Sequence, residues 1–365
     1  MQNMSQTFCT KAKVFSVHLT VHDAFHLFST DAKYVANSLS SPNGASHHCL
    51  THGMFSLTKV VVTPPLMLQE ILQGLTRRQL PHGGWSYHPT SQQASLEPTC
   101  LSLLALRSNV SEAENRGLRF LVSMQNPNGS WPAFEGDDRE GSWTTSLALW
   151  ALQGRAVHAS VLDRGRRWLL QSKGRESHWL WKWKFRTTDR HVRFDPDKFG
   201  WPWMPETNSW VVPTSFSLLA LKRFFPPNGA SQANFRIERG VEMLLDRVCP
   251  GGGWNVGNGV VYGVPLAPHP DATAIALVAL VTETSEPTVQ QSLDWLESAV
   301  RTRSAPSCLA WALIALQAHQ RSTQEPHSRL LQSIKESRIE DAATLAVVAL
   351  ALKSAAGQDI FGVPE

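Results

Sequence analysis

The chain has 365 residues, of which 42% are hydrophobic, and a formal net charge of +4. This composition is typical of a folded protein with a large core and excludes a disordered chain. The Lys and Arg residues are not gathered into runs of about five or more, so we expect no nucleic-acid partner.

Residues 1–64 show no helical or strand period, and we expect a weakly structured or disordered N-terminal extension there. Their histidine-rich stretch SHHCLTH, at 46–52, has a spacing that matches no zinc site. The beginning of the chain lacks the long apolar stretch of a secretion signal, and no run of apolar residues is long enough for a membrane span. The 5 cysteines include no CxxC pair, which favours reduced thiols. The sequence therefore predicts a cytoplasmic protein.

One pattern recurs six times after residue 65. Each copy opens with Pro, Thr, Ser or an acidic residue and continues as Leu, Ala and Val with little charge. Pro at a first helical position, and Ser, Thr or Asp as an N-cap, mark these openings as helix starts. A helix that is apolar on every side must be buried on every side. The six copies are at 97–108, 142–153, 212–224, 269–281, 305–317 and 340–352.

An amphipathic segment with a single apolar stripe stands before most of these copies. Six hairpins, each with an outer amphipathic and an inner apolar helix, predict an all-α fold, an (α/α)6 barrel over residues 65–356. An open solenoid is the alternative, but six units without a polar-faced capping repeat favour a closed ring. Residues 357–365 are expected to form a C-terminal tail. The amphipathic segments are at 66–79, 111–125, 162–173, 235–248, 289–301 and 328–337.

The stretch RGLRFLVSMQNPNGSW, residues 116–131, combines a helical glycine, Gln125 and Trp131. It resembles the QW repeat of squalene-hopene and oxidosqualene cyclases, in which the glutamine caps a helix end beneath the tryptophan and ties outer helices together. The resemblance implies a terpenoid-cyclase-like barrel and a structural role for the repeated tryptophans. Degenerate copies are at 74–85, 164–174 and 239–254.

By the same resemblance, the barrel is shared with the β subunits of protein prenyltransferases and with complement-type thioester domains. The zinc-binding Asp, Cys and His of the prenyltransferases are not visible around Cys308, and the Cys-Gly-Glu-Gln of the thioester domains is absent. Within the repeats, DDREGSW at 137–143 is typical of a solvated turn more than of a diphosphate-binding DDxxD. We therefore expect no metal and no cofactor.

The stretch HPDATA, residues 269–274, resembles the DxDDTA motif with which class II terpene cyclases protonate an alkene or epoxide. The resemblance places Asp271 at the proton donor and His269 at the first Asp, and it keeps Thr273. Protonating an alkene requires a carboxylic acid that is held neutral and supported by its neighbours. We take Asp271 as the catalytic acid and His269 as its supporting group. The alternative is that Asp271 only caps its helix or lines a pocket.

An insertion at 175–210, in the third repeat, holds six of the 14 Trp with Lys and Arg between them. A loop of this length and aromatic content is functional rather than disordered. Its aromatic faces could line an isoprenoid cavity and stabilise carbocations. Alternatively, WLWKWKF is a strand or amphipathic edge that contacts a membrane surface, or the insertion is a lid over the barrel mouth. The substrate-binding residues that we expect are Glu97, His191, Trp201, Trp203, Glu206, Trp210 and Thr273.

These features predict a single-barrel relative of the squalene-hopene cyclases, an isomerase that isomerises or cyclises an isoprenoid small molecule by proton transfer. The alternatives are a barrel that binds a lipid or a protein without turnover, and a prenyltransferase-like subunit. Triterpene cyclases place the reaction between two barrels, so a large substrate requires a second protein chain to complete the site. The Trp- and Lys-rich insertion adds a membrane surface to the expected partners.

Overall fold

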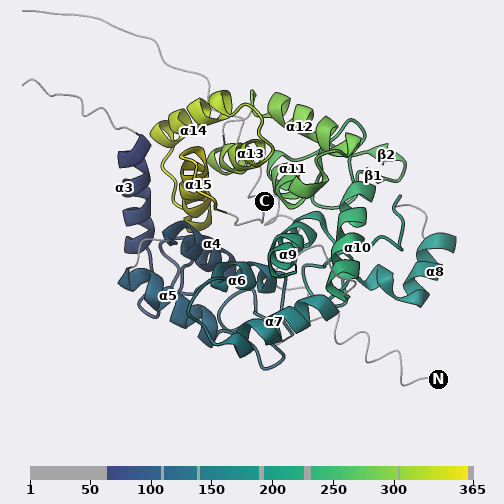
Figure 1. Cartoon of the computed structure of the whole chain (residues 1–365), viewed down its shortest axis with the longest axis horizontal. Coiled ribbons are helices and arrows are strands. Elements are labelled where there is room, and N and C mark those ends of the chain that lie inside the picture. Colours follow the sequence, from purple (N-terminus) through teal and green to yellow (C-terminus); the bar gives the residue numbers. More distant parts are fainter. Residues whose placement is uncertain are drawn as a thin grey trace, which may run out of the picture. The chain divides into compact units, whose positions relative to one another are not determined.

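Twelve helices alternate between an outer and an inner ring in the part of the chain that the structure describes (Figure 1). The structure is a computed structural model, and it describes residues 64–107, 111–137, 140–188, 193–225, 232–302 and 305–360. All of these lie in the second of the chain's two compact units, Val60–Glu365. The expected N-terminal extension lies outside the described residues, apart from Pro64.

The inner helices arise from the six apolar segments, and nearly all of their side chains are buried. Their uniform Leu, Ala and Val composition suits this position, because each is covered by an outer helix, by two inner neighbours and by the side chains inside the ring. The inner helices are α4 (Leu96–Leu106), α6 (Thr144–Leu152), α9 (Val211–Phe224), α11 (Pro270–Ala279), α13 (Pro306–Ala318) and α15 (Ala342–Ala355).

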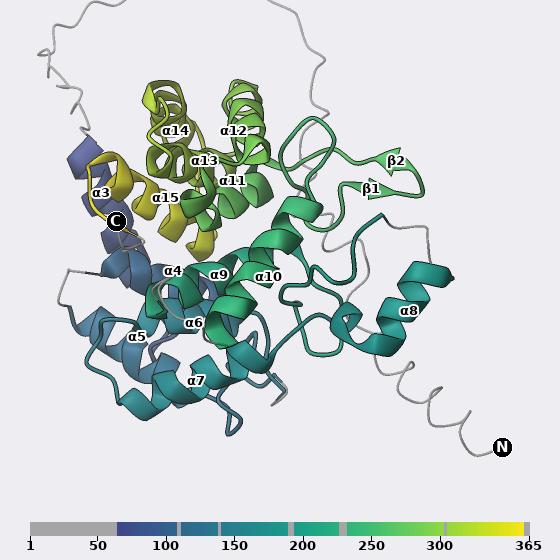
Figure 2. The same cartoon turned by 45° about the vertical axis from the view of Figure 1, so that its right-hand side comes forward.

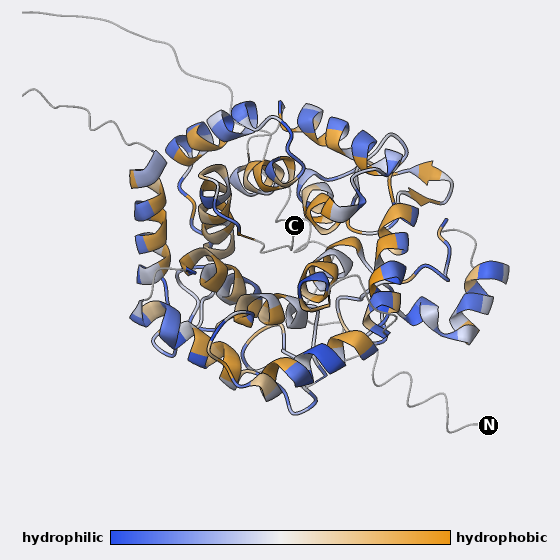
Figure 3. Cartoon of the chain, viewed as in Figure 1, coloured by the Kyte–Doolittle hydropathy of each residue, from blue (hydrophilic) through white to orange (hydrophobic). Residues whose placement is uncertain are grey.

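The outer helices are amphipathic, with apolar residues toward the inner ring and polar residues toward solvent (Figure 3). Each outer helix packs on the inner helix that precedes it in the sequence, and the first outer helix, α3, packs on α15 and α4. The outer helices are α3 (Pro64–Arg77), α5 (Glu112–Ser123), α7 (Ala159–Gln171), α10 (Gln232–Asp246), α12 (Pro287–Ala299) and α14 (Gln324–Glu336).

The inner ring is closed. Each inner helix contacts the next one in the sequence, and the last, α15, contacts the first, α4. The expected (α/α)6 barrel is therefore confirmed, and an open solenoid is excluded because its first and last helices would not meet. The expected C-terminal tail is partly packed, since Ile360 is buried against the core.

Buried tryptophans join the outer helices to the inner ring in four of the units. Each indole Nε1 donates a hydrogen bond to the carbonyl of a leucine near the end of the preceding outer helix, at 2.7–2.8 Å. Each tryptophan backbone N–H donates to a threonine hydroxyl in the first turn of the next inner helix, at 2.8–3.0 Å. The pairs are Trp85 with Thr99, Trp131 with Thr145, Trp201 with Thr214, and Trp254 with Thr273.

Two glutamines tie neighbouring outer helices together. Gln125 Nε2 donates to the carbonyl of Gly129 at 3.0 Å and to the carbonyl of Val161, in α7, at 2.9 Å. Gln79 makes the equivalent bonds to Gly83 and to Ala113, in α5. Each glutamine therefore links the end of one outer helix to the first turn of the next.

The insertion projects from the outer ring beside α10 (Figures 1 and 2). It contains the 3-10 helix η1 (Arg175–Ser177) and the helix α8 (Trp179–Thr187). The expectation of a strand at WLWKWKF is therefore wrong, because these residues form α8. Two further short elements follow in the described chain: the hairpin β1 (Val260–Val261) and β2 (Val264–Pro265), and the 3-10 helix η2 (Val281–Glu283).

Candidate functional site

The starts of the inner helices lie at one end of the barrel, which we call the N-terminal rim. Backbone hydrogen bonds link four of the six starts to the loop before a neighbouring inner helix. The loop that precedes α4 accepts from the first residue of α15, and the loops before α6, α9 and α11 accept from the starts of α4, α6 and α9. Acidic residues at the inner-helix starts therefore share this rim: Glu97, Asp271 and Asp341.

The acid with the clearest chemical environment at the rim is Glu97, in the first turn of α4. The hydroxyl of Tyr87 donates a hydrogen bond to Glu97 Oε2. The pKa of Glu97 rises from its ordinary value of 4.5 to about 7, because burial raises it more than the hydrogen bond from Tyr87 lowers it, and the negative charge of Asp341 also raises it. Tyr87 is 38% exposed, and its partial burial and the charge of Glu97 raise its own pKa. The pair thus holds a carboxyl group that is partly protonated at neutral pH.

Asp341 is fixed beside this pair by its own helix. It is the N-cap of α15, where its carboxylate accepts from the backbone N–H of Ala343 at 3.2 Å and of Thr344 at 2.8 Å. The backbone N–H of Ala342 donates to the carbonyl of Tyr87 at 3.2 Å, which brings the start of α15 to the start of α4. Neither Tyr87 nor Asp341 was expected from the sequence, since Tyr87 lies in the loop before α4 and Asp341 comes beside Glu97 only when the ring closes.

Asp271 lies in the first turn of α11, after Pro270, and is half-buried. The N-cap of α11 is His269, and no side chain caps this helix. The interpretation of Asp271 as the N-cap is therefore wrong, because His269 occupies the N-cap position and Asp271 lies inside the first turn. The Asp271 carboxylate forms no hydrogen bond or ion pair with any described residue. His269 is also half-buried, and its backbone N–H donates to the carbonyl of Trp254 at 2.8 Å.

Aromatic side chains meet inside the inner ring. The Phe216 ring, on α9, lies 5.9 Å from Trp311, on α13, and 6.3 Å from Trp150, on α6. Since α11 stands between α9 and α13 in the ring, the contact of Phe216 with Trp311 crosses the interior. Trp143 and Trp203 continue the cluster toward the rim, with ring centres 4.9 Å apart. Of these five residues, which we call the aromatic cluster, only Trp203 was expected from the sequence.

Two of the expected substrate-binding residues serve the framework. Trp201 is 1% exposed and donates through Nε1 to the carbonyl of Leu169. Thr273 is fully buried, accepts from the N–H of Trp254 at 2.8 Å, and donates to the carbonyl of Trp254 at 3.0 Å. Because every polar atom of these side chains already has a partner inside the repeat, we do not carry them forward as substrate ligands.

The remaining expected residues are dispersed. Glu206 is exposed on a loop, with a left-handed φ of 63°. Trp210 is the N-cap residue of α9 and lines a pocket beneath α8. His191 lies outside the described residues. On α8, Trp179 and Trp183 are 72% and 59% exposed.

The described residues contain no group of three His, Cys, Asp or Glu side chains arranged to hold a metal ion. Within the same residues, no helix combines the length and the apolar character that crossing a membrane requires.

Solved structures of α/α-barrel proteins resemble the chain at low sequence identity. A protein from Actinoplanes is 16% identical, with a TM-score of 0.53 over 80% of this chain and 100% of that one. The type II terpene cyclase MstE from Scytonema is 14% identical, with a TM-score of 0.54 over 80% of this chain and 98% of that one. An α-amylase from Clostridium perfringens is 10% identical, with a TM-score of 0.54 over 82% and 99% of the two chains. No family model and no curated protein matches the chain.

The chain has the α/α-toroid fold. A terpene cyclase and an amylase share this fold, so the fold alone does not determine which reaction a protein catalyses.

Proposed function

We propose that the protein is an isomerase that moves a proton on a small, isoprenoid-like substrate at the N-terminal rim, with Glu97 as the group that takes and returns the proton. The observation that carries this proposal is the Tyr87–Glu97 pair beside Asp341, in which the carboxyl pKa is about 7. General acid–base catalysis is most effective when the pKa of the catalytic group lies near the working pH.

The same pKa favours isomerisation over cyclisation. An isolated alkene is a very weak base, and a carboxylic acid with a pKa of about 7 is a weaker acid than an ordinary one. Such a group is better suited to removing a proton next to an activating group and returning it at a neighbouring carbon. In this scheme Tyr87 holds the carboxylate by its hydrogen bond while the proton is on the substrate.

The substrate class follows from the surroundings of the rim. The aromatic cluster begins at the rim with Trp143 and Trp203 and offers apolar faces to an unsaturated hydrocarbon. A terpene cyclase with the same fold has been solved in complex with geranylgeranyl dihydroxybenzoate, its substrate. The interior contact of Phe216 with Trp311 leaves little room for a long chain inside the ring, so we expect a short isoprenoid that reacts at the rim.

Asp271 remains the second acid to test. In the ring order α4, α6, α9, α11, α13 and α15, the helices α4 and α11 stand opposite each other, so Glu97 and Asp271 belong to different parts of the rim. One reaction centre is therefore expected to use one of them, and two single variants distinguish the acids.

The test incubates the purified chain in D2O with C10 to C20 isoprenoid alcohols, aldehydes and diphosphates and measures deuterium in the recovered substrate by mass spectrometry. We expect the wild type to exchange one substrate hydrogen. Glu97→Gln should lower the rate about 100-fold or more, the usual contribution of a general base, while Asp271→Asn keeps it. The rate of the wild type should change with pH around the Glu97 pKa of about 7.

Two outcomes contradict the assignment. If Asp271→Asn abolishes exchange and Glu97→Gln does not, the acid is Asp271. If substrates bind without exchange, the barrel is a binding module, which is the second candidate function.

A further inference from the structure

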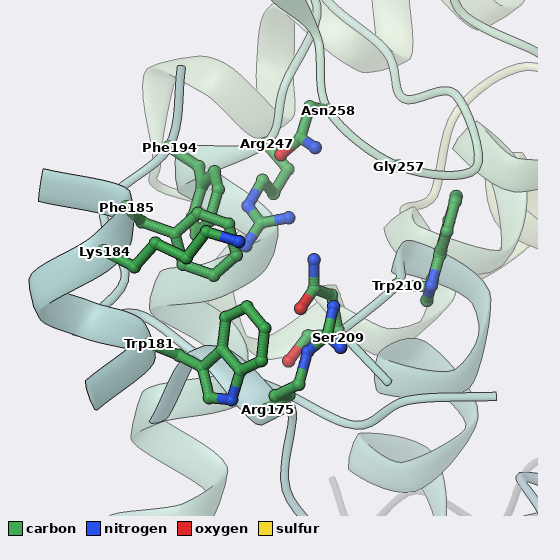
Figure 4. Close-up of a pocket in the computed structure, with 11 residues that line it drawn as sticks. Arg175, Trp181, Lys184, Phe185, Phe194, Ser209, Trp210, Arg247, Gly257 and Asn258 are labelled. Atoms are coloured by element: carbon green, nitrogen blue, oxygen red, sulfur yellow. The ribbon is translucent and has the colours of Figure 1, made fainter. Parts of the chain in front are cut away.

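A pocket of about 250 Å³ lies between α8 and the barrel, at the edge of the N-terminal rim. It is bordered by the insertion, by the end of α10 and by the loop before β1 (Figure 4). Trp210, at the start of α9, forms the wall on the side of the ring. This pocket is separate from the Tyr87–Glu97 pair, which lies beside α15.

The most deeply buried cation in the pocket lining is the guanidinium of Arg247, whose side chain is 2% exposed. Its Nε and Nη2 are buried and donate no hydrogen bond to the residues that the structure describes. The nearest carboxylate oxygens are Glu176 Oε1, 3.6 Å from Nη2, and Asp246 Oδ2, 3.8 Å from Nε, both beyond hydrogen-bond length. A buried arginine normally has its donors satisfied, so this one points to a missing acceptor.

Two further cations line the pocket. The Arg175 guanidinium lies 4.0 Å from the centre of the Trp181 ring, and the Lys184 ammonium lies 4.8 Å from the same ring. The buried Nε of Arg175 also donates no hydrogen bond. The described residues that line the pocket include these three cations and no Asp or Glu, and the nearby carboxylates of Glu176 and Asp246 lie within 4 Å of Arg247 without lining the pocket. This excess of positive charge favours an anionic occupant.

The other residues that line the pocket are aromatic or carry amide oxygens, and they indicate two further features of the occupant. Trp181, Phe185, Phe194 and Trp210 supply aromatic surfaces, and the Arg247 guanidinium lies 4.2 Å from the Phe194 ring centre. The side-chain oxygens of Asn208 and Asn258 are buried in the lining without a hydrogen-bond donor. Figure 4 shows the Arg247 side chain directed into the space that Trp181, Ser209 and Trp210 border.

We propose that this pocket binds a small planar organic anion, an aromatic carboxylate that carries an N–H or O–H donor. Its carboxylate accepts from Arg247 and Arg175 with Lys184 nearby, its ring packs against the aromatic walls, and its donor reaches Asn208 or Asn258. The inference does not depend on the proposed function, because it uses none of the residues at the Tyr87–Glu97 pair.

The test uses isothermal titration calorimetry on the full chain with indole-3-acetate and with indole-3-acetamide, which has the same ring and N–H but no charge. We expect the carboxylate to bind at least about 10-fold more tightly than the amide, since a charge-assisted hydrogen bond is stronger than a neutral one. Inorganic phosphate is the third probe. If phosphate binds as tightly as indole-3-acetate, the aromatic part of the assignment is overturned.

Variants locate the binding. Arg247→Met should weaken indole-3-acetate binding about 10- to 100-fold. Arg247→Met also leaves Glu176 without its nearest cation and could therefore disturb the core. Lys184→Gln is a second variant without this problem, because Lys184 is exposed on α8. It should weaken binding about 2- to 5-fold. Arg186→Gln is the matched control, since Arg186 is on the same helix, pairs with Asp197 and does not line the pocket. The proposal is overturned if wild type shows no binding at millimolar ligand, or if Lys184→Gln and Arg186→Gln behave alike.

Discussion

Glu97 illustrates how one residue changes its chemistry through its neighbours. It occupies the first turn of α4, where a carboxylate is ordinarily stabilised by the positive end of the helix dipole. Here burial and the nearby Asp341 outweigh that effect, and the pKa rises to about 7. The hydrogen bond that the Tyr87 hydroxyl donates to the carboxyl group offsets part of this rise in pKa.

This raised pKa predicts a pH dependence of stability. Between pH 4.5 and about 7 the folded chain holds a proton on Glu97 that the unfolded chain has lost, so the Glu97 contribution to stability is full below pH 4.5 and is lost as the pH rises through about 7. Glu97→Gln removes the titration. We expect the free energy of unfolding of this variant, relative to wild type, to increase by about 1–3 kcal/mol between pH 4.5 and about pH 8.

The measurement is urea unfolding at the two pH values. Glu70→Gln, at an exposed position of α3, controls for the change of charge. A difference between Glu97→Gln and wild type that stays constant with pH would contradict the assignment.

The packing of three outer helices depends on a glycine in the middle of each helix. Gly117, Gly165 and Gly240 stand in α5, α7 and α10, where glycine is ordinarily unfavourable. A Cβ at each position would lie 2.7–2.8 Å from the ring of a buried tryptophan. The missing side chain thus allows the tryptophan to pack directly on the helix. In α12, the small residue Ser292 accepts a hydrogen bond from the backbone N–H of Gly253, which precedes the buried Trp254.

Gly165→Ala should therefore destabilise the protein although alanine favours helices. The added Cβ would meet Trp131 Cζ3 at 2.8 Å and Leu149 Cδ2 at 2.9 Å. Overpacking of this kind costs about 1–3 kcal/mol, which exceeds the gain of about 1 kcal/mol in helix propensity. Gly74→Ala, in α3, is the control, because no atom lies within 4 Å of its added Cβ. We expect thermal unfolding to show a lower Tm for the first variant and an unchanged or higher Tm for the second.

Across the whole barrel, acidic side chains lie at the starts of inner helices, and two lysines donate to backbone carbonyls at the other end. Glu97, Asp271 and Asp341 stand at the helix starts. At the other ends, Lys222 Nζ donates to the carbonyl of Ala279 at 2.9 Å, and Lys353 Nζ donates to the carbonyl of Arg107 at 2.9 Å. This arrangement complements six helix dipoles that run in the same direction.

Closure of the ring depends on contacts between its first and last parts. Arg78, just after α3, donates through Nη1 to the carbonyl of Glu340 at 2.7 Å and through Nη2 to the carbonyl of Ile339 at 2.9 Å, both before α15. We expect Arg78→Met to lower the free energy of unfolding by about 1–3 kcal/mol. The exposed neighbour gives the control, since Arg77→Met should change it by less than about 0.5 kcal/mol. Equal effects of the two variants in urea unfolding would show that this contact does not hold the ring closed.

The sequence predicted the ring because its evidence is local. A helix of Leu and Ala without charge must be buried on all sides, and six such helices with six amphipathic partners have few arrangements other than a closed double ring. The N-caps were predicted less well: of the six inner helices, only α15 has a side-chain cap, from Asp341. In four of the others, the threonine hydroxyl of the first turn instead accepts a hydrogen bond from the backbone N–H of a buried tryptophan.

The barrel, its two layers and the position of the insertion thus follow from the sequence, since hydrophobic period and repetition are properties of neighbouring residues. The site, in contrast, depends on the folded structure. Glu97 acquires its raised pKa from burial and from Asp341, which is more than two hundred residues away along the chain. The pocket brings Arg175 and Lys184, from the insertion, to Arg247 at the end of α10. Burial and electrostatic coupling depend on distances through space, and these distances exist only after the ring has closed.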